Sequence, residues 1–566
     1  MSKNAERGPE SPDVRAELVR ILPELTIANE FFWTSGNDGC LRFRQCTRCQ
    51  ALVHPPGPMC RHCRGTDLAV TEVSGLARLI GFTVNHRMRI PGLEPPYVVG
   101  QVAIEEDDRV RLTTRIVDAD PDELMLGQQV RVVFEHVDDV YLPLFTPTGQ
   151  AGLTALPEDE IAPAQMRQHV RMPRTGHRFE HDSAITGIGA SQIGRRLMRD
   201  PLSLTIEASL AAIEDAGLRV DDIDGLSTYP GGPTAAGMGE GGVTALESSL
   251  RINPTWYNGG GETFGPAGSV IAAMLAVSAG LVRHVLCFRT VWQATHDALM
   301  RAGKISGGSS RVGPPMDYTL PFGASSAAHT LAMAAQRHMH TYGTSRETLG
   351  WIALNQRRNA ALNPAAIYRD PLTMEDYLSA RMITTPFGLY DCDVPCDASI
   401  AVIVSAADTA RDLRRPPVRV DAAGTQITER IDWDQSTLTH EPQALGQAAH
   451  LWSRSSLTPA DVDVALLYDG YTFNCLSWIE ALGFCGIGEA KDFLDGGKNI
   501  ARDGILPVNP HGGQLSHGRT HGMGLLQEAV VQLRGDAGER QIAGCNVAVV
   551  SSGGLTPSGA LLLTRD

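Results

Sequence analysis

LRVDDIDGLSTY at residues 218–229 is repeated, in altered form, as LTPADVDVALLY at residues 457–468. At a constant offset the two stretches share a leucine, two aspartates and a closing tyrosine, which is Tyr229 in one and Tyr468 in the other. A helical pattern precedes each copy, and a glycine-rich loop, an apolar helix and a strand follow it. Two similar halves of this kind predict a duplicated α/β domain built from stacked layers of helices and sheets.

The segments that follow the two copies keep the same order along the chain. After the first copy they are GGGETFGPAGS (259–269), VIAAMLAVSAG (270–280) and HVLCF (284–288). After the second copy they are HGGQLSHGRTHGMG (511–524), LLQEAVVQLRG (525–535) and CNVAVVSS (545–552). Because the order is constant although the identity is weak, we expect a duplication with halves at 181–415 and 416–566.

Four cysteines upstream of the repeat form a C-x2-C…C-x2-C pattern at Cys46, Cys49, Cys60 and Cys63. Two such knuckles bring four thiolates to the corners of the tetrahedron that structural Zn²⁺ prefers, and they leave no open position for catalysis. The pattern predicts a zinc ribbon over 39–72. A ribbon that keeps its shape without the metal is the alternative.

Short alternating apolar segments follow the ribbon and are separated by turns rich in glycine, proline and aspartate. They lie at 77–84, 97–104, 111–117 and 129–134. This spacing is typical of a small antiparallel barrel of the OB type, which we expect over 73–146. Such barrels can bind nucleic acid, but the acidic turn at 105–108 and the net charge of −15 argue against that partner here.

Two further segments flank these small domains. Apolar residues recur at helical spacing near the N-terminus, at Val14, Leu18, Ile21 and Leu22, and predict a helical segment over 1–38. Its apolar face would pack either on its own domain or on the larger C-terminal body. Residues 147–180 are rich in proline, glycine and polar side chains, and we expect a linker there.

The composition is that of an ordinary globular protein, with 43% hydrophobic and 20% charged residues among 566. At about 150 residues per domain, this length predicts three or four folding units. The chain has no run of about 18 apolar residues, and its first residues lack the apolar core of a secretory signal. Eleven cysteines with four in one metal-type cluster fit a reducing compartment. We therefore expect a cytoplasmic protein without a membrane span.

The region from residue 181 onward resembles the thiolase superfamily, in particular its sterol-carrier or lipid-transfer branch. The resemblance is carried by the two half-repeats, by LYDCDVPCDASIAVIV at 389–404, by YDGYTF at 468–473 and by NPHGGQLSHGRTHGMG at 509–524. The N-terminal ribbon and barrel resemble the zinc-ribbon/OB-fold partners of such proteins. The resemblance implies an α/β, five-layer αβαβα thiolase-like domain that is usually dimeric and acts on coenzyme A thioesters.

The thiolase nucleophile is missing from this chain. A thiolase carries a cysteine at the start of the helix after the first glycine-rich loop, near Thr263 here, and the segment 261–265 contains none. The second thiolase cysteine corresponds to SSGG at 551–554, and the C-terminal histidine corresponds to Arg519. A covalent acyl-cysteine route therefore lacks its nucleophile. Three other thiols lie in apolar patterns and are expected in the core: Cys287, Cys475 and Cys545.

A thiolase-like scaffold without that cysteine can still stabilise a thioester enolate. Retro-aldol cleavage of a β-hydroxyacyl-CoA needs donors for the enolate oxygen and groups for two proton transfers, but no acyl-enzyme. The chain resembles steroid side-chain aldolases in this respect, since Tyr468-Asp469-Gly470-Tyr471 matches their tyrosine motif. Two positions depart from that pattern, which has a histidine at Gly470 and a second tyrosine near Arg519.

The candidate site residues divide by role. Tyr468 is the candidate acid/base or oxyanion donor, or a buried structural tyrosine, and Arg519 is the cation that would lower its pKa. His521 and His511 are alternative proton carriers, because imidazole titrates near neutrality. Glu262 either acts as a base or caps the following helix. The candidate substrate-binding residues lie in the glycine-rich turns: Gly261, Thr263, Gly512, Gly513, His517, Gly553 and Gly554.

The sequence therefore predicts a carbon–carbon lyase. It would cleave a β-hydroxyacyl-CoA with a steroid or other bulky side chain into a ketone or aldehyde and a shorter acyl-CoA. The alternatives are an acyltransferase or thiolase with an unusual nucleophile and a non-catalytic acyl-CoA or lipid-binding protein. The implied cofactors are structural zinc and the coenzyme A of the substrate, and the implied partner is a second copy of the chain in a homodimer.

Three aspartates are expected to fix a loop: Asp391, Asp393 and Asp397.

Overall fold

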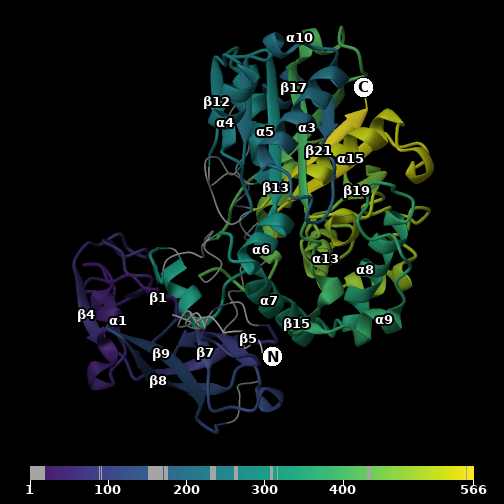
Figure 1. The fold of residues 1–566 in the computed structure, drawn as a ribbon. Helices are drawn as coiled ribbons and strands as arrows, with labels where there is room; N and C mark the ends of the chain where they lie inside the picture. Colours follow the sequence, from purple (N-terminus) through teal and green to yellow (C-terminus); the bar gives the residue numbers. More distant parts are fainter. Residues whose placement is uncertain are drawn as a thin grey trace, which may run out of the picture. The chain divides into compact units, whose positions relative to one another are not determined.

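The computed structural model describes most of the chain, namely residues 20–87, 90, 92–150, 170, 176–229, 237–260, 265–305, 310–314, 316–429, 435–555 and 558–565. Its elements, labelled in Figure 1, fall into two compact units. The first unit contains 1–156 and 308–327, and the second contains 157–307 and 328–566. The boundary after residue 156 lies inside the segment predicted as a linker, most of which is outside the described residues.

The ribbon of the first unit is a three-stranded sheet with the order β3–β2–β4. Its strands are β2 Arg42–Cys46, β3 Leu52–Val53 and β4 Leu68–Glu72. The strand β2 ends on the first metal-type cysteine, and the tight turn to β3 carries Cys49. The sheet therefore fixes the first knuckle directly.

The barrel of the first unit has five strands. They are β5 Leu76–Asn85, β6 Tyr97–Ile104, β7 Asp107–Ile116, β8 Gln129–Val137 and β9 Val140–Pro147. The order β5–β6–β7–β9–β8 closes through the pairing of β8 with β5. The sequence pattern located four of these strands and missed β9. That strand contains Pro143, and a proline within an apolar run argues against a strand when only the sequence is read.

The described part of the N-terminal segment, residues 20–38, is less helical than its sequence pattern indicates. Residues 1–19, which hold the start of that pattern, lie outside the described residues. Among the described ones, Leu22–Pro23 form β1, which pairs in parallel with β14 Arg311–Val312. The helix is confined to α1 Glu30–Trp33, followed by a 3₁₀ turn at Ser35–Asp38. A proline at residue 23 disfavours helix in the residue before it, which accounts for the extended backbone there.

The short helix α1 packs within its own unit. Phe32 and Trp33 are buried in the same apolar cluster as the barrel residues Leu79, Val102 and Phe145. Their burial follows from the run EFFW, which places two large rings on consecutive positions of one short helix. Trp33 also stacks on Tyr318, with ring centroids 5.1 Å apart, and residues 308–327 belong to the same unit although the sequence placed them in the first thiolase-like half. The described residues therefore show packing on the barrel and also on this part of the C-terminal sequence.

The second unit is built on one continuous nine-stranded sheet with the order β12–β11–β13–β17–β10–β18–β21–β20–β19. In chain order its strands are β10 Ser183–Ala190, β11 Gly225–Thr228, β12 Trp256–Asn258, β13 His284–Trp292, β17 Asp397–Ala406, β18 Val418–Gly424, β19 Val464–Leu466, β20 Val547–Ser552 and β21 Gly559–Arg565. The halves meet where β10 pairs antiparallel with β18. The repeated stretches end on β11 and β19, at equivalent places in the two halves.

Helices cover and separate the two halves of this sheet (Figure 1). The helices α5 Gly265–Ser278 and α15 Met523–Arg534 contact strands of both halves and form the central layer. The helix α3 Pro201–Ala216, with α4 Gly242–Leu250 beside it, covers the outer face of the first half, and α12 Ala449–Ser453 covers β18 and β21 of the second. This is the thiolase-like αβαβα arrangement with internal duplication.

The remaining helices and strands of this unit lie in the connections between these layers. They are α6 Gln293–Arg301, α7 Ala327–Tyr342, α8 Arg346–Ala360, α9 Met374–Ser379, β15 Met382–Thr384, β16 Phe387–Gly388, α10 Ala407–Ala410, α11 Glu441–Gln443, α13 Thr472–Ala481 and α14 Ala490–Phe493. Among the described residues, no helix is both long and apolar enough to span a bilayer.

Local sequence signals explain where the main helices begin and end. Asp200 caps α3 by accepting a hydrogen bond from the Leu202 N–H at 3.2 Å, and Pro201 occupies the first helical position. Gly217 ends the helix in the left-handed conformation, with φ of 76°. The helical pattern that precedes the first copy of the repeat is thus confirmed by α3, whose start and stop signals are local.

Candidate active site

The four ribbon cysteines meet in the first unit, with their sulfur atoms within 4.8 Å of one another. Cys46 Sγ lies 3.5 Å from Cys63 Sγ, and Cys49 Sγ lies 3.5 Å from Cys60 Sγ. In a tetrahedral centre with Zn–S bonds of about 2.3 Å, neighbouring sulfurs are about 3.8 Å apart. The cluster is therefore almost the size of a zinc centre, and the donor set is that of structural zinc. His62 is not part of it and contacts Arg109 instead.

Tyr468 follows β19 in the second unit, and its backbone is fixed from two sides. The Asn509 side chain donates to the carbonyl of Leu467 and accepts from its N–H, both at 2.8 Å. The N–H of Tyr468 donates to Ser551 Oγ at 2.8 Å. The loop at 509–524 and the end of β20 therefore hold the tyrosine motif between them.

Two guanidinium groups act on the Tyr468 hydroxyl. Burial raises the pKa of Tyr468 to about 12, while the charges of Arg519 and, more weakly, Arg289 act to lower it. Arg519 is held in place by Asp393, with Nε to Oδ2 at 2.9 Å, and by donation to Gln293 Oε1 at 2.7 Å. The phenol is therefore protonated at neutral pH. The guanidinium groups of Arg519 and Arg289 would stabilise a phenolate formed during proton transfer.

His521 lies between the two tyrosines that end the repeated stretches. Its ring stacks on Tyr229, with centroids 6.0 Å apart, and meets Tyr468 edge-on at 6.4 Å. Arg289 Nη2 lies 3.0 Å from His521 Nδ1. Since a guanidinium only donates, Nδ1 accepts, and the proton of the neutral ring is on Nε2. Burial, reinforced by the charges of Arg289 and Arg519, lowers the pKa of His521 well below its usual value, so the ring offers an N–H donor without carrying charge.

Arg289 is a site residue that the sequence interpretation missed. It lies on β13, donates to the Met238 carbonyl at 2.6 Å, and its guanidinium carbon is 5.8 Å from the centroid of the Tyr229 ring. Burial lowers the pKa of Arg289 to about 10, and the Glu240 carboxylate opposes that shift. Burial raises the pKa of Glu240 in turn to about 7. The sequence does contain a signal for it, because Arg289 directly follows the apolar run HVLCF. A charged side chain on a buried strand is uncommon and points to a functional or ion-pair role.

The glycine pair at 512–513 lets the loop approach the tyrosine motif closely. Gly513 has φ of +58°, and a Cβ there would lie 1.9 Å from Asp469 Oδ2. The next N–H in the loop, that of Gln514, donates to Asp469 Oδ1 at 2.8 Å. Burial raises the pKa of Asp469 to about 7. Asp469 therefore joins the loop to the tyrosine motif, and the role of Gly512 and Gly513 in substrate binding stays a prediction.

The turn after β20 packs against the start of α13. The Gly553 carbonyl accepts from Trp478 Nε1 at 2.8 Å, and a Cβ on Gly554 would lie 1.8 Å from Asn474 Nδ2. Ser552 Oγ also lies close to the central helix α5, 2.7 Å from where a Cβ on Gly265 would be. The second thiolase cysteine position is therefore filled by small groups at the junction of the two halves. Substrate binding by Gly553 and Gly554 stays a prediction.

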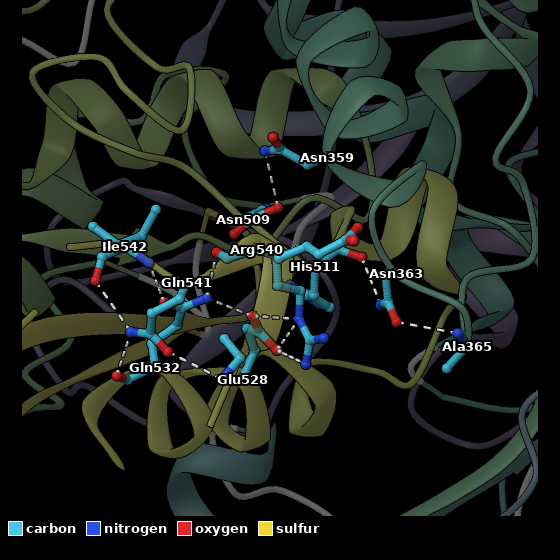
Figure 2. A network of polar contacts seen from close by, with 12 residues as sticks. Asn359, Asn363, Ala365, Asn509, His511, Glu528, Gln532, Arg540, Gln541 and Ile542 are labelled. Atoms are coloured by element: carbon cyan, nitrogen blue, oxygen red, sulfur yellow. Dashed lines mark hydrogen bonds and ion pairs between the residues drawn. The ribbon is translucent and has the colours of Figure 1, made fainter. Parts of the chain in front are cut away.

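His511 and His517 form a pair of their own. Their rings meet edge-on with centroids 5.0 Å apart, and both rings are buried. Figure 2 shows His511 beside Arg540, which is paired with Glu528 at 3.0 Å. Burial lowers the pKa of His517 to about 4 and that of His511 well below its usual value, and Arg540 adds to both effects. The structure thus brings His521 and Arg519, rather than this pair, to Tyr468.

Three predicted site residues lie outside the described residues: Gly261, Glu262 and Thr263. The described backbone resumes at Gly265, where α5 begins. Their roles remain predictions from the sequence.

The aspartates of the segment 389–404 differ in what they contact. Asp391 accepts from the Tyr377 hydroxyl at 2.5 Å and from Thr472 Oγ1 at 2.6 Å, and Asp397 accepts from Thr295. Both therefore fix loops, as expected. Asp393 was grouped with them, but it pairs with Arg519 and thereby reaches the surroundings of Tyr468.

Four buried cysteines outside the ribbon do not resemble activated nucleophiles. Cys287, Cys475 and Cys545 are buried, which confirms their prediction as core thiols. Cys396 was not considered from the sequence, and its Sγ donates to the Arg519 carbonyl at 3.3 Å. Burial raises the pKa of all four thiols, so each is protonated at neutral pH.

Family models and known proteins resemble the chain along most of its length. Residues 424–563 match the model for a thiolase C-terminal domain-like region. Residues 33–69 match the ChsH2 rubredoxin-like zinc ribbon domain, and residues 70–135 match the ChsH2 C-terminal OB-fold domain. The two N-terminal matches correspond to the ribbon and the barrel of the first unit.

Relatives of the thiolase-like part include aldolases, lyases and acetyl-CoA acetyltransferases. A steroid side-chain-cleaving aldolase of Thermomonospora curvata is 35% identical over 394 residues, which are 67% of this chain and 97% of that protein. A 17-hydroxy-3-oxo-4-pregnene-20-carboxyl-CoA lyase of Mycobacterium tuberculosis is 35% identical over 397 residues, covering 67% and 98%. The solved structure of an Ltp2-ChsH2(DUF35) aldolase superposes with a TM-score of 0.61 at 33% identity, covering 68% of this chain and 98% of that one. The chain therefore belongs to the thiolase superfamily, in the branch of the steroid side-chain aldolases, and carries a ChsH2-type zinc ribbon and OB-fold domain in the same polypeptide.

Proposed function

We propose that this protein cleaves a carbon–carbon bond in a β-hydroxyacyl-CoA by a retro-aldol reaction. The β-hydroxyl loses its proton, the bond between the α and β carbons breaks, and its electron pair forms the enolate of the thioester. Protonation of the α-carbon then gives a shorter acyl-CoA, and the β-carbon leaves as a ketone or aldehyde. Because the relatives are named for steroid side chains, a steroid β-hydroxyacyl-CoA is the first substrate to test.

The observation that carries this proposal is the group around Tyr468. A protonated phenol, the buried guanidinium group of Arg289, the partly exposed one of Arg519 and a neutral imidazole with its N–H on Nε2 lie together. Such a set supplies hydrogen-bond donors and positive charge where an enolate oxygen develops, and it supplies one transferable proton. None of these groups needs to bond covalently to the substrate.

The roles follow from the protonation states. Tyr468, with its pKa raised to about 12, acts as the proton donor or as an enolate-oxygen donor. His521 donates from Nε2, and Arg289 keeps it in that tautomer. For the base that accepts the hydroxyl proton we propose Glu262, on the sequence argument that it precedes the central helix α5. His511 and His517 then act through the loop that they share with Arg519.

One experiment separates the lyase from its alternatives. The purified protein is incubated with a steroid β-hydroxyacyl-CoA, and the ketone and acyl-CoA products are followed by mass spectrometry. Release of both products without added free coenzyme A supports the lyase. A strict requirement for coenzyme A, together with an acyl adduct on Cys396 or another side chain, supports acyl transfer. Saturable binding without turnover supports a carrier.

We also propose that the protein is a cytoplasmic homodimer formed through its thiolase-like unit. The support is the family to which it belongs, whose members are usually dimeric, and the cysteine content. Light scattering coupled to size exclusion tests the dimer directly, since a single peak at the mass of one chain, 60.8 kDa, would contradict it.

A further inference from the structure

A second cluster of metal-type side chains lies in the second unit, apart from the residues around Tyr468. His338 comes from α7, His440 immediately precedes α11, and Glu480 comes from α13. One ligand atom from each lies within 4.8 Å of the others. The side chains are only 3%, 2% and 0% exposed, so solvent does not compete for these atoms.

The carboxylate of Glu480 is oriented so that one oxygen faces both imidazoles. Its Oε1 accepts from the Ala490 N–H at 3.0 Å. Its Oε2 lies 3.1 Å from His338 Nε2 and 2.8 Å from His440 Nε2. Among the described residues, Glu480 forms its ion-pair contacts with these two histidines. A buried carboxylate is costly unless a positive charge lies nearby.

The two imidazoles approach that oxygen differently. His338 Nε2 makes a hydrogen bond to it, and the other ring nitrogen, Nδ1, lies 2.9 Å from Thr344 Oγ1. His440 Nε2 is buried and, despite its short distance, makes no well-aligned hydrogen bond within the described part of the chain. His440 Nε2 is thus close to the Glu480 oxygen but is not aligned to donate to it. Two metal ligands have this relation when the imidazole and the carboxylate both point at a shared ion.

We propose that His338, His440 and Glu480 bind a divalent transition-metal ion, with zinc as the preferred one. Two imidazoles and one carboxylate are a recurrent ligand set for Zn²⁺. With metal–ligand bonds of about 2.0–2.1 Å, ligand atoms of a tetrahedral centre are about 3.3 Å apart, so the two observed contacts need to open by only a few tenths of an ångström. The contact of His338 Nδ1 with Thr344 is the kind of outer hydrogen bond that orients a metal-binding histidine.

The surroundings indicate a structural site rather than a catalytic one. The ring of Phe473 lies 5.6 Å from that of His338 and 6.2 Å from that of His440, and Tyr342 lies 4.8 Å from His338. These rings pack against the two imidazoles, and the three ligand side chains are at most 3% exposed, so a substrate would not reach them from solvent. The ion would join α7 to α13, the helix that begins at Thr472 directly after the tyrosine motif.

Metal content per chain tests the proposal. The full-length protein is saturated with zinc, freed of unbound metal, and measured by inductively coupled plasma mass spectrometry. We expect two equivalents in the wild type, one in the ribbon and one at His338, His440 and Glu480. His440→Gln and Glu480→Gln should each hold one equivalent. His340→Gln, which changes an exposed histidine on the same helix α7, should hold two.

A spectroscopic measurement keeps the test valid if a variant fails to fold. Wild-type protein stripped of zinc and titrated with Co²⁺ should show two spectra: one with thiolate charge-transfer absorption from the ribbon and one of the nitrogen–oxygen type without it. A single equivalent of zinc in the wild type, with only the thiolate-type cobalt spectrum, would overturn the proposal and leave the cluster as a hydrogen-bonded triad. Neither outcome depends on whether the protein is a lyase.

Discussion

At the scale of single residues, the hydroxyl of Tyr468 is the group on which the proposed chemistry depends most directly. Replacing it in Tyr468→Phe removes one oxygen and leaves the packing of the ring against His521. We expect kcat to fall by about 10²–10⁴-fold, the usual contribution of a positioned proton donor. The thermal unfolding midpoint should stay near that of the wild type. Steady-state kinetics on a β-hydroxyacyl-CoA check this, with Tyr257→Phe on the exposed side of β12 as the matched control.

Arg289 acts on two groups at once, because it fixes the tautomer of His521 and lowers the pKa of Tyr468. In Arg289→Met both effects are lost, so kcat should fall about a hundredfold, as when an oxyanion-hole donor is removed. Arg289→Lys keeps the charge but loses the planar fork, and should recover only part of the rate. Added guanidinium should raise the rate of Arg289→Met, whereas a merely structural arginine would show no such rescue.

The buried carboxyl of Asp469 should make the stability of the folded protein depend on pH. Burial raises its pKa to about 7 in the folded state, so the folded protein binds a proton more tightly than the unfolded chain does. The stability that this proton confers is complete below the unfolded pKa near 4, and it is lost as pH rises through 7. Asp469→Asn mimics the protonated form and should lose none of it. Melting temperatures measured from pH 5 to 8 should therefore fall for the wild type relative to the variant, and parallel curves would contradict the assignment.

At the scale of secondary-structure elements, the loop at 509–524 is positioned by glycine. Gly513→Ala introduces a Cβ 1.9 Å from Asp469 Oδ2, on a backbone with φ of +58°. Gly535→Ala, at the end of α15, has a similar φ of +80° and open space around it. The left-handed conformation should cost each variant about 1–2 kcal/mol. Gly513→Ala should lose appreciably more stability and most of its activity. Chemical denaturation of the pair isolates the steric part, and equal losses would show that the loop can move aside.

How far the sequence predicts the elements depends on how local their signals are. The helix before the first copy of the repeat was found because its apolar residues recur at helical spacing, and its cap, proline and closing glycine also lie within its own sequence. The strand β9 was missed because Pro143 interrupts an apolar run, although the closed barrel tolerates it opposite Phe134. Within residues 20–38 the predicted helix is found only at Glu30–Trp33, because Pro23 favours extended backbone before it; residues 1–19 lie outside the described part of the chain.

The same distinction applies to the candidate site. Tyr468, Arg519 and His521 were named because their segments resemble the tyrosine motif and the glycine-rich histidine segment of the thiolase-like aldolases. Arg289 meets His521 across 232 positions of sequence, and no spacing rule connects them. The pairing of Asp393 with Arg519 is also a product of the tertiary fold, so the sequence placed Asp393 among loop-fixing residues.

At the scale of the whole molecule, the duplication explains why the candidate site has contributions from both halves. Tyr229 and Tyr468 occupy equivalent positions in the repeat, and both contact the ring of His521. The central helices α5 and α15 contact strands of both halves, so the ends of β11 and β19 are held near one another. A duplicated fold can thus keep one tyrosine for chemistry and use its counterpart to hold an imidazole in place.

Each compact unit has an apolar core of its own, so we expect the ribbon to unfold without loss of the thiolase-like unit. In the double variant Cys46→Ser/Cys49→Ser the ribbon loses its zinc, and with it most of the free energy that folds so small a sheet. We expect fast hydrogen exchange over residues 42–72, while β13 and β17 stay as protected as in the wild type. Cys40→Ser, which removes a nearby thiol that is not in the metal cluster, should exchange like the wild type throughout. Loss of protection in β13 and β17 as well would mean that the zinc ribbon supports the fold of the thiolase-like unit too.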